Sequence, residues 1–367
     1  MVGTTPLAVV EYGMVTAVGF NGPATCAAMR AGISGIHQAN LWDFTIGEWL
    51  PAGRPLMPQW WEGPDMLLEL LAPAIAECQE KARTLKLRTG PIQPEDIPIL
   101  TLVAPPDRPY RASDLETRVA RGLAHKLGGA LPPGSEIIPQ GRTGLLTALD
   151  VARKYLKSRR VHLVIIAGVE SFLRQVLVEH YIRQGRMLCG TNSNGFIPGE
   201  AACAVVVSRA SDALGARLVI AGVGEGHEPG QAGGTAHSPV TGDGLTRAMR
   251  TALSAAGTEY YQINTSLSDL NGERFKFKER TIATGRLDRL PPSGRSTRPL
   301  GYVDEWHPIE YLGEIGSAVF PCLLGWAFEA GRTGYVLGAK MMLFAGEDQG
   351  TRAAVVTMFQ GGKHDER

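Results

Sequence analysis

The residues of greatest chemical interest lie in a short turn between an apolar stretch and a helix. Ile137 and Ile138 predict the end of a buried strand, and Gln140-Gly141-Arg142-Thr143-Gly144 follows directly. A sharp turn from strand to helix is where a nucleophile elbow presents a reactive side chain. Thr143 carries the one hydroxyl of this turn, and no cysteine accompanies it. Because no histidine is evident beside Thr143, capping of the following helix is the favoured role of its hydroxyl.

Three other features carry chemically useful groups, and each has a simpler structural interpretation. His307, in Trp306-His307-Pro308, has the chemistry of a base, but a loop histidine packed against Trp306 is the favoured interpretation. Cys189 and Cys203 are interpreted as small buried or half-buried apolar residues. The glycine-rich run 222–226 faintly resembles a phosphate-binding turn. No helix follows it directly, so the end of a strand is predicted instead.

The elbow turn at 140–144 must be held by a strand before it and a helix after it. Apolar residues recur at helical spacing directly after the turn and predict a helix that starts at Gly144, with charged residues on its opposite face. These apolar residues are Leu145, Leu146, Leu149, Ala152 and Leu156. Residues 161–169 then form a β-branched run that is typical of a strand covered on both faces. Together these segments predict a βαβ unit.

A second strongly apolar helix is predicted over residues 316–331. Both apolar helices are expected to lie buried between two sheets, as the middle layer of a five-layered α/β/α/β/α fold. Strands and helices alternate twice along the chain, which predicts two pseudo-repeated halves, residues 1–210 and 211–367. Residues 40–64 are predicted to be irregular, and residues 267–300 show little periodicity.

The composition excludes several classes of protein. Hydrophobic residues make up 44% of the chain and charged residues 20%, which is ordinary for a globular protein. A net charge of +1 without a basic stripe argues against nucleic-acid binding. No apolar run is long enough to cross a membrane, and the N-terminus lacks the pattern of a signal peptide. The five scattered cysteines show no metal-ligand spacing, so we expect free thiols in the cytoplasm and neither a metal nor another cofactor.

Four glycine-rich motifs occur in a characteristic order. They are GMVTAVG at 13–19, GFIPGE at 195–200, Asp243-Gly244 before a helix, and Gly350-Thr351 near the end of the chain. In this order they resemble the motifs of the β-ketoacyl synthases, which have the thiolase-like fold, and the match runs from about residue 7 to 359. The run at 195–200, similar to the GFxxGE loop of that family, is the most specific. The resemblance implies a thiolase-like fold for nearly the whole chain.

The same resemblance places the catalytic positions of the family on residues with different chemistry. These synthases load an acyl chain on an elbow cysteine and use two histidines to decarboxylate the malonyl donor and hold its enolate oxygen. The cysteine position falls on Gly141, beside Arg142 and Thr143. The two histidine positions fall on Ser266 and Glu314. Glycine has no side chain, and a glutamate is anionic where an oxyanion donor is required, so no catalytic residue is intact.

Two further family positions also differ: the lysine position falls near Ile309 and the gating phenylalanine position near Asp348. We therefore expect a non-catalytic protein that acts as a binding or accessory partner. Degenerate members of this kind resemble proteins encoded beside type VI secretion effectors, which implies effector handling; an acyl carrier protein is the other expected partner. A chain-length-factor-like subunit is a variant, with Gln140 as its elbow glutamine after a one-residue shift. The alternative is an acyltransferase or hydrolase with a rebuilt active site.

Assembly is expected to follow the same resemblance. The family pairs strands next to the elbow across a two-fold axis, so we expect a homodimer in which residues 136–138 form the shared edge.

The charge of Arg142 leads to a specific prediction for the site. A buried, unpaired guanidinium at the start of a helix is costly, so an inward-pointing Arg142 requires a negative partner. Glu314 and Asp348 both converge on the elbow by the family alignment. We predict that Arg142 pairs with one of them, preferentially Glu314, and that this ion pair fills the former acyl site. The competing interpretation points Arg142 to the dimer interface or to solvent.

Overall fold

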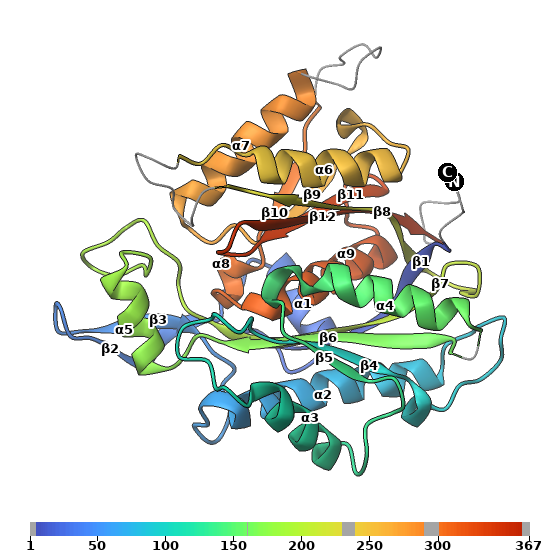
Figure 1. Ribbon diagram of the computed structural model, residues 1–367, viewed down its shortest axis with the longest axis horizontal. Helices are drawn as coiled ribbons and strands as arrows, with labels where there is room; N and C mark the ends of the chain where they lie inside the picture. Colours follow the sequence, from blue (N-terminus) through green and yellow to red (C-terminus); the bar gives the residue numbers. More distant parts are fainter. Residues whose placement is uncertain (1–4, 160, 230–238, 290–300, 362–367) are drawn as a thin grey trace.

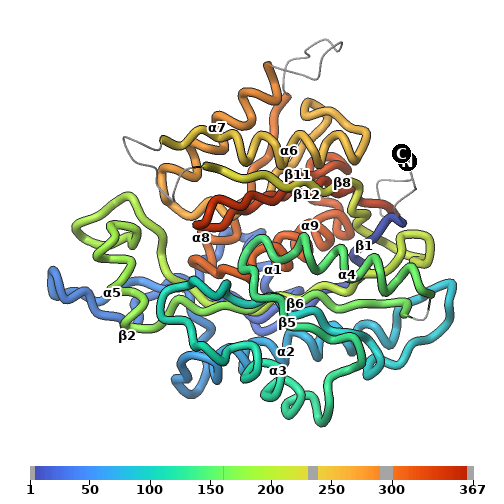
Figure 2. Tube along the Cα trace, in the orientation of Figure 1, coloured from blue at the N-terminus to red at the C-terminus, as the bar shows by residue number. Residues whose placement is uncertain are grey.

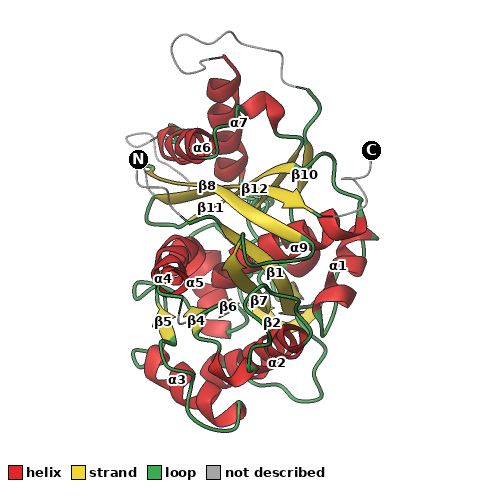
Figure 3. Cartoon of the chain, turned by 90° about the vertical axis from the view of Figure 1, so that its right-hand side faces the viewer, coloured by secondary structure: helices red, strands yellow, loops and turns green. Residues whose placement is uncertain are grey.

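Helices and sheet halves of the chain stack in five layers, as the sequence predicts. The computed structural model describes residues 5–159, 161–229, 239–289 and 301–361. One outer layer holds the helices α2 (Gly63–Arg83) and α3 (Leu115–Lys126), and the other holds α6 (Asp243–Ala255) and α7 (Arg274–Arg289) (Figure 1). Two halves of a sheet lie inside these layers and enclose α4 (Leu145–Lys157) and α9 (Val319–Thr333). Figure 3 shows the same stacking after a turn of 90°.

Ten of the described strands form one hydrogen-bonded sheet with two similar halves. The first half consists of β5 (Glu136–Ile138), β4 (Ile99–Leu102), β6 (Leu163–Ser171), β7 (Glu200–Arg209) and β1 (Leu7–Val15), in that spatial order. The second half consists of β10 (Asp304–Trp306), β9 (Thr265–Ser268), β11 (Lys340–Gly346), β12 (Thr351–Gln360) and β8 (Arg217–His227). In each half the first two pairings are parallel and the last two antiparallel.

The two halves join where Leu7–Val9 of β1 pairs with Leu218–Ile220 of β8 in antiparallel register. The repeated strand order confirms the predicted pseudo-repeat. The division of the chain into domains at residue 210 remains a prediction.

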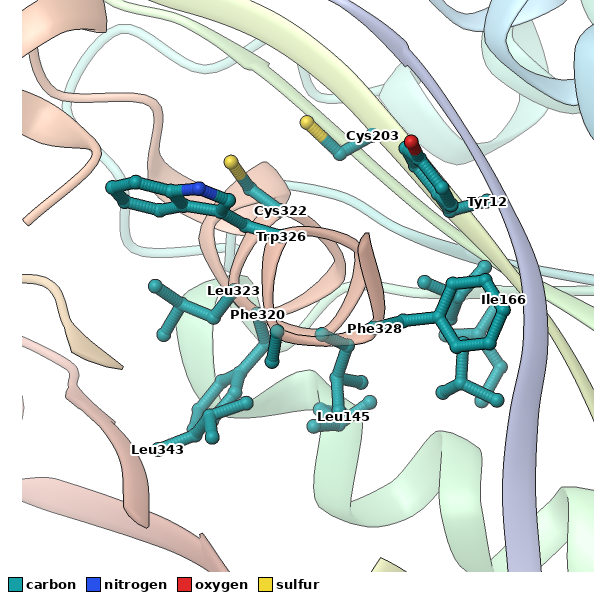
Figure 4. Close-up of a cluster of buried hydrophobic side chains, with 14 of the residues drawn as sticks. Tyr12, Leu145, Ile166, Cys203, Phe320, Cys322, Leu323, Trp326, Phe328 and Leu343 are labelled. Carbon is teal, nitrogen blue, oxygen red and sulfur yellow. The ribbon is translucent and has the colours of Figure 1, made fainter. Parts of the chain in front are cut away.

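The middle layer contains the largest apolar cluster of the described chain. The helix α9 is buried on nearly every side, as expected from its composition. Figure 4 shows its Phe320, Leu323 and Phe328 beside Leu145 of α4 and Ile166 of β6. Burial of this many apolar side chains at about 25 cal/mol per Å² is the main source of stability.

The helix α4 differs from the prediction, because only one of its faces is buried. Leu145, Leu149 and Leu156 are buried, whereas Asp150 and Lys154 are exposed. The expectation of burial on every side is therefore wrong for α4 in the single chain. Its charged face, which the sequence already shows, lies in solvent.

Three glycines of β8 bring the strand close to α6. A Cβ atom on Gly222, Gly224 or Gly226 would lie 2.0 Å from a carbonyl oxygen of α6. The oxygens belong to Ala252, Ala248 and Gly244, in that order. These glycines are thus needed for helix packing, and the interpretation of the run 222–226 as strand rather than phosphate loop is confirmed.

Two stretches that looked irregular have regular structure. Residues 36–53 contain a hairpin, β2 (Ile36–Asp43) and β3 (Glu48–Gly53), which lies beside α5 (Gln175–Arg183) at one side of the molecule (Figure 2). The helix α7 lies within the polar stretch 267–300, where no periodicity predicts it. Its buried face carries Lys276 and Glu279, which form ion pairs, so an apolar stripe is not required. Two short helices, α1 (Gly22–Arg30) and α8 (Ile309–Leu312), complete the described set.

The helices of the described residues include none that is both long and apolar enough to span a membrane.

Candidate functional site

The elbow turn is a single 3₁₀ turn, Gly141–Gly144, between β5 and α4. Gly141 has φ = 59°, a left-handed conformation that favours glycine. A Cβ atom at this position would lie 2.1 Å from Oε1 of Glu347. The same oxygen accepts a hydrogen bond of 2.5 Å from the backbone N–H of Arg142. An internal carboxylate therefore occupies the space that a nucleophile on residue 141 would need.

The side chain of Arg142 points inward and is 1% exposed. Its Nε donates to Oε1 of Glu314 at 3.1 Å, and its Nη1 donates to Oε2 of Glu347 at 3.3 Å. Oδ1 of Asp348 lies 3.7 Å from the same Nη1. The predicted ion pair between Arg142 and Glu314 is confirmed, and Asp348, the other predicted partner, also lies within ion-pair distance. The competing orientation toward solvent or an interface is wrong.

Glu314 is fully buried and bonded from several directions. Its Oε2 accepts from Nδ2 of Asn271 at 2.6 Å, and its Oε1 accepts from the backbone N–H of Gly316 at 3.0 Å. Nζ of Lys276 lies 3.8 Å from Oε2. Burial acts to raise the pKa of Glu314, but Arg142 and Lys276 outweigh burial and hold the pKa at about 2. The carboxyl is thus ionised at every physiological pH.

Arg108 links the elbow to the second apolar helix. Its Nε donates to Oε1 of Glu170 at 2.7 Å, and its Nη2 donates to Oε2 of Glu347 at 3.4 Å. The other oxygen of Glu170 accepts from both the backbone N–H and the hydroxyl of Ser317, each at 2.8 Å. Burial raises the pKa of Glu347, although Arg108 and Arg142 oppose that shift. One guanidinium therefore bridges the two turns that precede α4 and α9.

Arg186 closes the network on its outer side. Its Nη1 donates to Oδ2 of Asp348 at 2.8 Å, and its Nε donates to Oε1 of Glu273 at 2.7 Å. The guanidinium lies over the rings of Tyr181 and Phe196, at 5.4 and 5.9 Å. Burial acts to raise the pKa of Asp348, but Arg142 and Arg186 hold it well below its usual range. Arg186 thus connects the elbow network to the aromatic side chains of Tyr181 and Phe196.

Thr143 and Ser266 show no sign of a catalytic role. The Thr143 hydroxyl donates to the carbonyl of Gln140 at 3.5 Å, within its own turn. It does not cap α4, because no side chain accepts a capping hydrogen bond from the first backbone N–H groups of that helix, so the predicted capping role is wrong. Ser266 lies in β9, opposite Glu305 and Met342 of the neighbouring strands.

His307 forms a contact between an imidazole and a serine hydroxyl, the arrangement of a nucleophile with its base. Its Nδ1 lies 3.0 Å from the hydroxyl of Ser268. Burial is the main cause that lowers the pKa of His307, and the positive charge of Arg280 lowers it further. The imidazole is therefore neutral at pH 7. The ring meets Phe277 at 6.4 Å, while Trp306 stacks on Trp326 at 4.9 Å. Ser268 itself is 1% exposed, which leaves its hydroxyl little access to a substrate.

Within the described ranges no cluster of three His, Cys, Asp or Glu side chains has the geometry of a metal site. The five cysteines are unpaired; Cys203 is buried and Cys189 is half-buried, as interpreted from the sequence.

Sequence reasoning missed the cations and carboxylates that complete the network. They are Arg108, Glu170, Arg186, Asp269, Glu273, Lys276 and Glu347. Glu170 carried a usable signal, because it ends the β-branched run of β6 as a charged residue inside a buried strand. Glu347 adjoins Asp348, which the family alignment had already placed at the elbow. Arg108 and Arg186 lie outside helices and strands, where no periodicity marks burial.

Comparisons with known proteins agree with this architecture. Neither a family model nor a curated protein matches the sequence. A solved structure described as a type II polyketide acyl-carrier protein in complex with its ketosynthase, AntDE:AntF, contains a chain that superimposes with a TM-score of 0.72 at 13% identity. The match covers 97% of this chain and 100% of that one. The chain has the ketosynthase fold.

Two other solved structures with the ketosynthase fold support this assignment. The ketosynthase ApeO in complex with its chain length factor ApeC, from Xenorhabdus doucetiae, matches with a TM-score of 0.67 at 15% identity, over 97% of this chain and 98% of that one. The oxazolomycin ketosynthase domain OzmH KS7 from Streptomyces albus matches with a TM-score of 0.69 at 12% identity, over 97% and 76%. The predicted thiolase-like, five-layered ketosynthase fold is thereby confirmed.

Proposed function

We propose that this chain is a ketosynthase-like protein that does not condense acyl groups and acts by binding another protein. One observation carries the proposal: the Glu347 carboxylate and the paired Arg142 fill the elbow where an acyl-bearing cysteine would stand. The ionised Glu314 supports it, because a negative charge would repel a developing enolate instead of stabilising it. In this proposal Gly141, Ser266, Glu314 and Asp348 mark positions of a lost catalytic site.

The direct test is exposure of the purified chain to malonyl and acyl thioesters, both free and on an acyl carrier protein. We expect no covalent acyl adduct by intact-mass spectrometry and no condensation product by chromatography. An active ketosynthase treated in parallel is the positive control. A stable adduct or product formation above that of the thioesters alone would refute the proposal.

The proposed partner surface includes the edge of the first sheet half. β5 ends the strand order, so one side of its backbone pairs with no strand within the described residues. Pairing of two such edges across a two-fold axis gives a homodimer, and pairing with a ketosynthase gives a heterodimer like the complexes named above. Light scattering at micromolar concentration distinguishes the two: a dimer of the isolated chain supports the first, and a monomer that shifts only on addition of a ketosynthase supports the second.

Within this proposal the cargo is an effector of a type VI secretion system, and the compartment is the cytoplasm, where free thiols persist. The support for effector handling is the sequence resemblance, and that for the compartment is the set of unpaired cysteines. Co-purification with a candidate effector, with an acyl carrier protein as the competing bait, tests the partner class.

A second candidate is a hydrolase or acyltransferase with a rebuilt site, favoured by the bond between Ser268 and His307. In that case the imidazole would take the hydroxyl proton as Ser268 attacks an ester or thioester carbonyl. Labelling by a fluorophosphonate that is lost in Ser268→Ala and in His307→Ala would establish it. Burial of Ser268 leads us to expect no labelling.

A further inference from the structure

A small cavity lies beside Arg108, where three helices begin around the end of β6. Its volume is about 60 Å³, and it is lined by Pro64 and Leu67 of α2, Leu115 of α3, Val169 of β6 and Leu177 of α5, among other residues. Most of its lining is apolar. Because one water needs about 10–15 Å³ of such volume, the space fits a group of about four or five carbon atoms.

Arg174 places an available cation at the rim of this cavity. Its Nη1 donates to the carbonyl of Tyr110 at 2.7 Å, and the contacts found among the described residues include no carboxylate partner for it. The other two arginines of the lining differ. Arg108 pairs with Glu170 at 2.7 Å, and Arg111 pairs with Glu116 at 2.8 Å. Arg174 therefore retains free donors in a setting where a carboxylate fits as a bidentate acceptor.

The backbone around the cavity also favours an anion. α2, α3 and α5 all begin here, and none of the three has a side-chain hydrogen bond at its N-cap. Such helix starts carry partial positive charge and unused N–H groups. Tyr110 adopts φ = 54°, a left-handed conformation that is uncommon for a residue with a side chain. This turn presents the Tyr110 carbonyl to Arg174 and so holds the guanidinium at the rim.

We propose that this cavity binds a carboxylate that carries a small apolar group. The carboxylate lies on the Arg174 guanidinium, and the apolar group enters between Leu67, Leu115 and Leu177. Two sources offer this chemistry: a free short-chain carboxylic acid, and the C-terminal residue of a protein chain with an aliphatic side chain. The inference is independent of the elbow, because a condensing enzyme and a non-catalytic protein accommodate such a cavity equally well.

Calorimetric titration of the full chain with isovalerate and with N-acetyl-leucine tests the site, and isovaleramide serves as the uncharged probe. We expect a dissociation constant on the order of millimolar for at least one acid, and at least tenfold weaker binding of the amide. Arg174→Ala should weaken binding of the acids about tenfold or more, and Ala112→Leu should weaken it by filling the space. Arg183→Ala is the matched control, since Arg183 lies on the same helix but pairs with Glu179 at the surface.

Each outcome has a defined meaning. Tighter binding of isovalerate assigns the ligand to free acids, and tighter binding of N-acetyl-leucine assigns it to chain termini. The acids are titrated to about 20 mM, well above the expected millimolar dissociation constant. If neither acid saturates the protein by then, or if isovaleramide binds as tightly as the acids, the proposal is overturned. If Arg174→Ala fails to fold by its melting curve, Arg174→Gln replaces it. Unchanged binding in the folded variant also overturns the proposal.

Discussion

The turns that precede the two central helices share one backbone arrangement but differ in charge. Gly141 has φ = 59° and Gly316 has φ = 50°, and a Cβ atom on either would lie 2.1 Å from a glutamate oxygen. The N–H of the following residue donates to that glutamate in both turns. The following residue is Arg142 in the first turn and Ser317 in the second. The first turn therefore adds a buried cation, and the second does not.

This difference determines how many charged partners each turn requires. The second turn needs only Arg108 and hydrogen bonds to satisfy Glu170. The first turn needs Glu314, Glu347 and Asp348 around Arg142, because a guanidinium without water must have ionised partners. We infer that the charges at the elbow depend on one another, whereas the second turn tolerates the loss of a single side-chain hydrogen bond.

The largest effect is expected when one partner of the buried pair is removed. Glu314→Ala leaves Arg142 short of a carboxylate and should lower the free energy of unfolding by about 3–5 kcal/mol. The double variant Arg142→Ala with Glu314→Ala should regain part of that loss. Urea denaturation measures both, with the exposed Glu310→Ala as control. An unchanged midpoint in Glu314→Ala would show that the two turns do not differ in this way.

The shared arrangement predicts equal sensitivity to a side chain at the two glycines. Gly141→Cys and Gly316→Ala should each cost about 2–4 kcal/mol, because the Cβ displaces a bonded carboxylate and the backbone is left-handed. Gly141→Cys should also gain no condensing activity, since Ser266 and Glu314 remain. Gly129→Ala, with no atom within 4 Å of the new Cβ, is the control and should change stability little. Tolerance at one glycine only would separate the turns.

Glu200 offers a comparison with the buried carboxylates of the elbow, because burial outweighs its arginine contact, whereas arginines outweigh burial at Glu314 and Asp348. Glu200 bonds to Ser171 and lies 3.4 Å from Arg54. Burial raises its pKa to about 7, despite the opposing effects of Ser171 and Arg54. The folded state thus holds a proton that the unfolded chain releases above its ordinary pKa of 4.5, so stability falls as pH rises from about 4.5 to 7.

Replacement by a neutral isostere should remove this dependence. The free energy of unfolding of Glu200→Gln should match that of the native chain at pH 4.5 and exceed it by about 3 kcal/mol at pH 7.5, as measured by urea denaturation at each pH. An equal difference at both pH values would mean that Arg54 already compensates the charge.

The smallest effect is expected at the neutral turn. Ser317→Ala removes the hydroxyl bond to Glu170 but leaves the N–H bond and Arg108 in place. The expected loss is about 1 kcal/mol in denaturation experiments. A loss as large as that of Glu314→Ala would contradict the contrast between the turns.

Local pattern was sufficient to predict most of the fold. The helices after Gly141 and Gly316 and the strand at 163–171 follow from apolar periodicity, which reports burial directly. The helix α7 was missed because the ion-paired Lys276 and Glu279 occupy part of its buried face, which leaves too few apolar residues for a periodic pattern. The hairpin at 36–53 was missed because Pro51 and two tryptophans, Trp42 and Trp49, obscure strand alternation there.

The elbow could be predicted only in part. The pairing of Arg142 with Glu314 followed from two charges that a family alignment brought together. Arg108 and Arg186 could not be found in this way, since neither lies at an aligned catalytic position and both reach the network from loops. Long side chains from irregular segments leave no periodic trace in the sequence, although their charges decide which carboxyls are ionised.

The glycines of β8 limit the length over which α6 and the sheet can stay in such close contact. The facing carbonyls are spaced four residues apart, about 6.0 Å along a helix, while alternate strand residues are spaced about 6.6 Å. The two repeats match closely over three contacts and drift apart with each further one. Glycines farther along β8 would fall out of step with the carbonyls of α6. The three glycines therefore set both the short distance between β8 and α6 and the length over which that distance is kept.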